Sequence, residues 1–348
     1  MIAGMTIADE VDARVRGFEP DRFRAPWWLH GGHVQTVGGK LLRRDVDVAL
    51  ERERIDTPDG DFLDLDIARA DTGADPAPVA VVLHGLEGSA RKPYMLLAYR
   101  ALTSAGITAV GMNFRGCSGE PNRARRLYHS GETGDLRTVL AHVATRFPGS
   151  PVGAIGFSIG GNVLLKYLGE EGDDARSTMH AAVAISVPFD LAAGADNIER
   201  GPMGKVYTHY FMRSLRQKAV IARARLQGLC DVDAAIRART LRDFDDALTA
   251  PVHGFADASD YYRRCGSCAF LHAIRVPTLL IQAEDDPFQR ARDIPWGAIR
   301  SNPWLITAIS RTGGHVGFIG GTPWRPLFRA EDEAARFVAH ALKAAGAS

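Results

Sequence analysis

Gly156-Phe157-Ser158-Ile159-Gly160-Gly161 carries the pattern G-x-S-x-G between a predicted strand and a predicted helix. The apolar run 152–157 is typical of a buried strand, and residues 160–168 are typical of a helix. A tight turn between them would project the Ser158 hydroxyl into a cleft above the positive end of the helix. Larger side chains at positions 156 and 160 would collide with the strand or the helix. A turn that only packs a helix on a sheet is the alternative, but this setting favours a nucleophilic serine.

Strands and helices alternate on both sides of this turn. Residues 52–69 predict an antiparallel strand pair around the turn Pro58-Asp59-Gly60. Further strands are predicted by short apolar runs at 79–83, 107–114, 181–187, 278–282 and 305–310. Helices are predicted at 94–104, around an apolar stripe at 136–143, and at 331–343. This order predicts an α/β protein with a mostly parallel central sheet flanked by helices.

The alternation is interrupted once, between residues 188 and 273, where the pattern is helical. We therefore expect an N-terminal arm at 1–50, a core formed by 51–187 and 274–348, and a helical lid insertion at 188–273. Ligands bind at the carboxyl ends of the strands in such sheets, and this is where the insertion would lie. An expanded loop is the alternative, and the length of the segment argues against it.

A nucleophilic serine needs a base that accepts its proton, and this base is expected late in the chain. His315 follows the predicted strand 305–310 and is flanked by glycines, whereas His129 precedes the nucleophile and His340 falls in the last helix. The orienting carboxylate should follow an intermediate strand. Asp286 and Asp285 both follow 278–282, and the spacing favours Asp286, with Asp285 as the second choice. The order Ser158, Asp286, His315 fits this interpretation.

The developing negative charge on the substrate oxygen needs backbone N–H donors. One is expected from Ile159, directly after the serine. The other is expected from the loop after strand 79–83, which reads His84-Gly-Leu-Glu-Gly-Ser89, with Leu86 as the donor. Met203, Tyr207, Tyr210, Phe211 and Met212 suggest an apolar acyl pocket, and a role in the lid core is equally open.

Composition excludes several other classes of protein. The chain has 348 residues, 46% of them hydrophobic and 24% charged, and its net charge of +1 gives no sign of nucleic-acid binding. Residues 1–17 do not resemble a signal peptide, and no apolar run is long enough for stable membrane insertion, so we expect a cytoplasmic protein. Docking on a membrane is disfavoured because no single helix is strongly basic and amphipathic. The spacing of Cys265 and Cys268 lacks the further ligands of a zinc site.

Several blocks together resemble the YheT-like branch of the α/β-hydrolase superfamily. The blocks are Trp28-Leu-His-Gly-Gly-His-Val-Gln-Thr36, His84-Gly-Leu-Glu-Gly-Ser89, Asn113-Phe-Arg-Gly-Cys-Ser-Gly119, Gly156-Phe-Ser-Ile-Gly-Gly-Asn162, Phe244-Asp-Asp246, Tyr261-Tyr262, Asp285-Asp-Pro-Phe288 and Gly313-Gly-His-Val-Gly-Phe318. The resemblance covers residues 22 to 340. It implies hydrolysis of carboxylic esters, with short- to medium-chain or lipid-like acyl groups, through an acyl-enzyme on Ser158 and without metal or cofactor.

Two other functions stay open at this point. An alcohol acyltransferase would use the same acyl-enzyme with an alcohol in place of water, and a non-catalytic ligand-binding relative would keep the fold alone. The expected partner in each case is a small molecule, and an ester is favoured. Oligomeric state is not indicated by the sequence.

Overall fold

The computed structural model describes residues 15, 17–44, 46–71 and 76–346. The expectation about a signal peptide falls almost wholly on residues outside this part, as does the start of the N-terminal arm. No helix within the described ranges combines the length and the apolarity that a membrane crossing needs.

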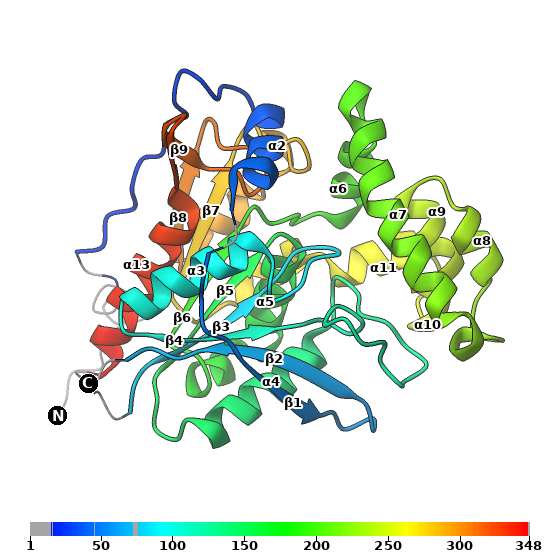
Figure 1. Cartoon of the computed structure of the whole chain (residues 1–348), viewed down its shortest axis with the longest axis horizontal. Coiled ribbons are helices and arrows are strands. Elements are labelled where there is room, and N and C mark those ends of the chain that lie inside the picture. Colours follow the sequence, from blue (N-terminus) through cyan, green and yellow to red (C-terminus); the bar gives the residue numbers. More distant parts are fainter. Residues whose placement is uncertain (1–14, 16, 45, 72–75, 347–348) are drawn as a thin grey trace.

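An eight-stranded sheet forms the centre of the molecule, in the order β1-β2-β4-β3-β5-β6-β7-β8 (Figure 1). Its strands are β1 (Glu51–Asp56), β2 (Phe62–Ala68), β3 (Val79–Leu83), β4 (Thr108–Met112), β5 (Val152–Phe157), β6 (Ala181–Ile185), β7 (Thr278–Ala283) and β8 (Leu305–Ser310). β2 pairs antiparallel with β1 and with β4, and every other pair is parallel. The predicted α/β fold with a mostly parallel sheet is confirmed.

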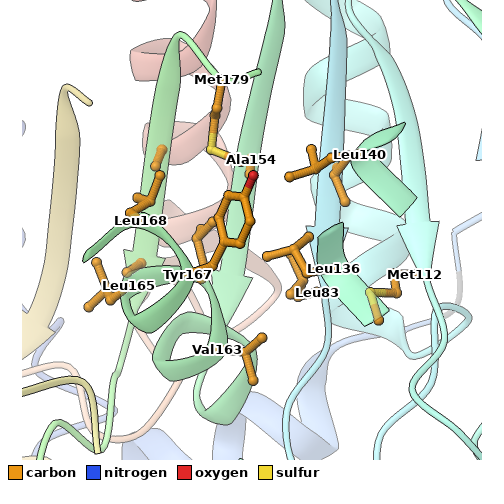
Figure 2. Packing of buried hydrophobic residues seen from close by; sticks show 14 of the residues in the cluster. Leu83, Met112, Leu136, Leu140, Ala154, Val163, Leu165, Tyr167, Leu168 and Met179 are labelled. Carbon is orange, nitrogen blue, oxygen red and sulfur yellow. The ribbon is translucent and has the colours of Figure 1, made fainter. Parts of the chain in front are cut away.

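Helices cover both faces of this sheet, and successive residues of each strand contribute to opposite faces. The flanking helices are α3 (Pro93–Ser104), α4 (Thr133–Arg146), α5 (Ile159–Glu171), α12 (Trp296–Ser301) and α13 (Arg329–Gly346). α4, α5 and α12 share one apolar cluster with the strands, and α3 and α13 share the other. Figure 2 shows the first cluster, where Leu136 and Leu140 of α4 and Tyr167 of α5 pack around Ala154 of β5.

The segment between β6 and β7 is helical and has an apolar core of its own. It comprises α6 (Leu191–Ile198), α7 (Gly201–Leu226), α8 (Val232–Arg237), α9 (Leu241–Phe244), η2 (Asp245–Thr249), α10 (Ala250–Val252), α11 (Ala258–Cys265), η3 (Ser267–Ala269) and η4 (Leu271–Ala273). η2 is a single π-helical turn. In Figure 1 these helices project to one side of the sheet.

Several elements were not predicted from the sequence. Helix α2 (Gly32–Leu42) lies within the predicted arm, and the short helix η5 (Ala291–Asp293) and α12 lie between β7 and β8. β9 (Ile319–Thr322) and β10 (Arg325–Phe328) form an antiparallel hairpin after β8. α2 packs on β9. At this contact, the terminal methyl groups of Leu29 and Ile319 lie against Gly38, which has no side chain of its own.

Candidate active site

Ser158 lies on a strained turn between β5 and α5. Its backbone has φ 54° and ψ −121°, a conformation that L residues rarely adopt, and its N–H group donates to Ile185 O at 2.8 Å. A Cβ atom at position 156 would lie 2.5 Å from Gly160 O, and one at position 160 would lie 2.6 Å from Leu83 O. The two glycines of the motif therefore allow the close approach of strand, turn and helix that exposes the serine hydroxyl.

His315 joins Ser158 to Asp286. Its Nε2 atom lies 2.9 Å from Ser158 Oγ, and its Nδ1 atom lies 2.9 Å from Asp286 Oδ2. Asp286 is buried, and its Oδ1 atom accepts hydrogen bonds from the N–H groups of Phe288 at 2.8 Å and Gln289 at 3.3 Å. These amides fix the carboxylate so that Oδ2 faces the imidazole. The structure thus brings together the three residues that the sequence singled out.

Asp285 has a different position from its neighbour. Its Oδ1 atom accepts a hydrogen bond from Gly314 N at 2.9 Å, so it holds the loop that carries His315 and does not contact the ring itself. Burial raises the pKa of Asp285, and the charge of Asp286 acts in the same direction. Of the two acids left open by the sequence, Asp286 is the one placed against the imidazole.

The loop of His315 is also held by groups that sequence reasoning missed. Thr36 Oγ1, on α2, accepts a hydrogen bond from His315 N at 2.8 Å, and Ser186 Oγ accepts one from Val316 N at 2.9 Å. The amide of Gln35 donates to Ile319 O at 3.1 Å and accepts from Ile319 N at 2.8 Å. The only sequence signal for α2 is the resemblance of residues 28–36, which says nothing of this contact.

The loop after β3 lies against the nucleophile, because a Cβ atom at Gly85 would stand 3.2 Å from Ser158 Cβ. Gly85 N donates to Tyr94 Oη at 2.9 Å, and His84 Nδ1 bonds to Gly85 O at 2.8 Å. Burial lowers the pKa of His84 to about 4, so the ring is neutral and its Nε2 can accept from Phe114 N at 3.2 Å. Hydrogen bonds therefore hold both the N–H group and the carbonyl group of Gly85 in place.

Of the two predicted oxyanion donors, Leu86 belongs to this loop and Ile159 is the first residue of α5. Among the described residues, no backbone hydrogen bond takes the N–H group of Leu86 or of Ile159. Ile159 is the first residue of its helix, where the N–H groups have no partner within the helix. Both residues line the cavity next to Ser158. This geometry suits a pair of donors aimed at a substrate oxygen.

Glu87 connects this loop to helix α7. It has a left-handed backbone, with φ 55°, and its side chain is buried. Its carboxylate accepts from Lys218 Nζ at 2.8 Å, from Tyr128 Oη at 2.7 Å and from the hydroxyl of Ser214. Burial is the largest single influence and acts to raise the pKa of Glu87, but the charge of Lys218 and the hydrogen bonds to the carboxylate together hold that pKa below its ordinary value. The pair spans 131 residues of sequence.

Replacing Glu87 alone is expected to lower the free energy of unfolding more than replacing both Glu87 and Lys218. Glu87→Gln leaves the ammonium of Lys218 without a counter-charge, and we expect it to lower the free energy of unfolding by about 3 kcal/mol. The double variant Glu87→Gln/Lys218→Met should be more stable than Glu87→Gln alone. Urea unfolding of the four proteins of this cycle measures both effects. If Glu87→Gln were as stable as the unchanged protein, Glu87 and Lys218 would not form a buried ion pair that stabilises the fold.

A cavity of about 110 Å³ opens beside Ser158 and His315. Leu86, Ile159 and Phe288 form its wall on the side of the sheet. The opposite wall comes from the helical segment and consists mainly of apolar side chains, among them Leu191, Ile198, Phe211, Leu215, Phe244 and Leu248. The cavity therefore suits an apolar group attached to a carbonyl at Ser158.

The five apolar residues predicted for an acyl pocket or a lid core divide between several places. Phe211 lines the cavity, Met212 is buried in the core of the helical segment, and Tyr210 is exposed. Tyr207 lies behind the cavity wall, with its ring 4.8 Å from that of Phe288. Met203 is half-buried and does not line the cavity. The sequence showed the apolar character of this helix but not which of its faces meets the site.

The part of the cavity formed by η2 is polar. Asp245 and Thr249 of this π-helical turn line it, together with His129 and His253. Burial raises the pKa of Asp245 to about 6, and its carboxylate accepts from Thr249 Oγ1 at 2.6 Å and Tyr262 Oη at 2.7 Å. Burial also lowers the pKa of His253 to about 4. The histidine is neutral near pH 7, and the cavity has an uncharged imidazole there.

A mostly parallel sheet, a serine on a strained turn after β5, and a histidine bonded to a carboxylate that follows β7 define an α/β hydrolase. The family described as serine aminopeptidase, S33, matches residues 74–294. The putative esterase YheT of Escherichia coli is 42% identical over 296 residues, which are 84% of this chain and 86% of that protein. The chain belongs to this family of α/β hydrolases, on its YheT-like branch.

Other relatives and solved structures are similar over most of the chain. Phospholipase ABHD3 of Homo sapiens is 29% identical over 84% of this chain and 73% of its own. A monoacylglycerol lipase of Saccharomyces cerevisiae is 33% identical over 73% of this chain and 59% of its own. An esterase of Pyrococcus furiosus has the same fold, with a TM-score of 0.55 at 16% identity, and the match covers 92% of this chain and 98% of that one.

Proposed function

We propose that the protein hydrolyses carboxylic esters through an acyl-enzyme on Ser158. The observation that carries the proposal is the continuous chain from Ser158 Oγ through His315 to Asp286, with both separations at 2.9 Å. The names of its relatives, an esterase, a phospholipase and a monoacylglycerol lipase, agree in the type of bond that is cleaved. The reaction needs no metal or organic cofactor in this proposal.

In the first half-reaction, His315 Nε2 takes the proton of Ser158 as Oγ attacks the ester carbonyl. The carbonyl oxygen becomes an oxyanion, which accepts hydrogen bonds from Leu86 N and Ile159 N. The carbon–oxygen bond to the alcohol then breaks, and His315 gives its proton to the departing alcohol. In the second half-reaction, His315 takes a proton from water, hydroxide adds to the acyl carbon, and the proton returns to Ser158 as the acid leaves.

The helical segment 188–273 acts as the lid over this site in our proposal. Its residues supply much of the cavity lining, and most of them are apolar. The substrate is then an ester with a short- to medium-chain or lipid-like acyl group, which the apolar wall would hold. The volume of about 110 Å³ is small, so longer chains require the lid to move outward.

Filling this cavity should change the preferred chain length. Ala195 of α6 is buried and lines the cavity, so Ala195→Phe would occupy space that an acyl chain needs. We expect the ratio of kcat/KM for p-nitrophenyl octanoate to that for the acetate to fall about tenfold or more. Val220→Phe, on an exposed position of α7 outside the cavity, is the matched control and should leave the ratio unchanged. An unchanged ratio in Ala195→Phe would place the acyl chain elsewhere.

A further inference from the structure

One end of the molecule carries most of the exposed large apolar side chains. The described residues expose ten such side chains, and seven of them lie on residues 27–44, the first half of α7 and the β9–β10 hairpin. Trp27 and Trp324 are 82% and 88% exposed, and Trp324 occupies the turn of the hairpin. Val34 and Leu41, seven residues apart, lie on the same face of α2. We call these three segments together the docking surface.

Contacts join the three segments into one surface. Trp28 Nε1 donates to Gly321 O at 3.0 Å, which fastens the residues before α2 to the hairpin. Lys40 Nζ lies 3.5 Å from the centre of the Tyr210 ring, which connects α2 with α7. In Figure 1, α2, β9 and one end of α7 occupy the same end of the molecule, at the top of the view.

This surface adjoins the active site. His33 Nδ1, on α2, lies 2.9 Å from the hydroxyl of Tyr207 on α7. The Tyr207 ring packs edge-on against Phe288, which in turn contacts the ring of His315 at 4.4 Å between centroids. The rings of Tyr207 and Phe288 therefore lie between His33 on α2 and the general base, His315.

Charge is segregated onto the same end. Residues 22–44, 200–230 and 311–328 contain no Asp or Glu, although the whole chain is almost neutral at +1. Within the described ranges, no carboxylate pairs with the exposed side chains of Lys40, Arg44, Lys205 or Arg325, which all belong to these segments. The docking surface thus presents cationic and apolar side chains, and its three segments contain no carboxylate that could neutralise the cations.

We propose that the docking surface binds the face of an anionic lipid bilayer. Tryptophans settle at the level of the lipid headgroups, and each Lys or Arg near an anionic leaflet strengthens binding about fivefold. The surface is assembled from three separate segments, so the absence of a single basic amphipathic helix in the sequence does not argue against it. Docking there would hold the active site, which lies behind Tyr207 and Phe288, close to membrane esters without inserting a helix.

The test is co-sedimentation of the full-length protein with vesicles of phosphatidylcholine alone or of equal parts phosphatidylcholine and phosphatidylglycerol. We expect binding to the anionic vesicles and little to the neutral ones, with weaker binding at high salt. Trp27→Ala/Trp324→Ala should lower the partition coefficient about tenfold or more. Lys40→Gln/Arg325→Gln should lower it about 25-fold, from fivefold per charge.

Val220→Ser/Ile221→Ser is the matched control, because these exposed apolar residues lie on α7 outside the docking surface. This variant should bind as the unchanged protein does, and the Trp variant should hydrolyse a water-soluble ester at the unchanged rate. Absence of binding by folded protein, equal binding to both vesicles, or equal loss in the control variant would each overturn the proposal. None of these results depends on the chemistry proposed for Ser158.

Discussion

Ser158→Ala is expected to reduce kcat/KM for p-nitrophenyl esters by a factor on the order of 10⁶, because the variant lacks the hydroxyl that His315 activates. The hydroxyl is the atom that faces His315 Nε2 at 2.9 Å, and alanine removes it without adding volume. Steady-state rates and circular dichroism, measured on the same preparations, separate lost chemistry from lost folding.

Ser301→Ala is the control for this variant, since Ser301 is an exposed serine at the end of α12, away from the cavity. It should retain the full rate. A folded Ser158→Ala protein that keeps a substantial part of the activity would show that another group attacks the ester.

Asp286→Asn is expected to lower kcat about 10⁴-fold while leaving the fold intact. The carboxylate at 2.9 Å accepts the Nδ1 proton of His315 and so leaves Nε2 free to take the serine proton. An asparagine amide facing Nδ1 would favour the opposite tautomer, in which Nε2 already carries a proton. Titration of rate against pH for both proteins also measures how strongly the imidazolium is stabilised.

Asp285→Asn provides the comparison, because the two acids are adjacent and differ in what they contact. Its oxygen accepts a hydrogen bond from Gly314 N, and an asparagine oxygen can accept the same bond. We expect a loss of less than about tenfold in kcat. A larger loss in Asp285→Asn than in Asp286→Asn would reverse the roles that the geometry assigns.

Much of the fold followed from local pattern. The buried strands β3, β5 and β6 are continuous apolar runs, and β7 is apolar at its centre, which the sequence shows directly. The β9–β10 hairpin was missed, because Ile319-Gly-Gly-Thr322 lacks the alternation that marks a strand and has two glycines, a residue depleted in strands, at its centre. Helix α2 was missed for a similar reason, since three of its eleven residues are glycine and its only start signal is another glycine.

A site residue could be predicted where its type and its position in the chain were enough to identify its role. Ser158 and His315 stand at the ends of strands, in loops rich in glycine, and each can be selected from the sequence alone. The bond from His315 N to Thr36 links residues 279 positions apart, and no local pattern reports such a contact. The pairing of Glu87 with Lys218 and the assembly of the docking surface depend in the same way on how distant segments meet.

Labelling with a fluorophosphonate probe, followed by mass mapping of the modified peptide, reports the reactivity of the serine itself without assuming a substrate. We expect a single modified residue, Ser158, and loss of labelling in His315→Ala. Labelling at a different serine, or undiminished labelling of Ser158 in His315→Ala, would contradict the conclusion that His315 activates Ser158.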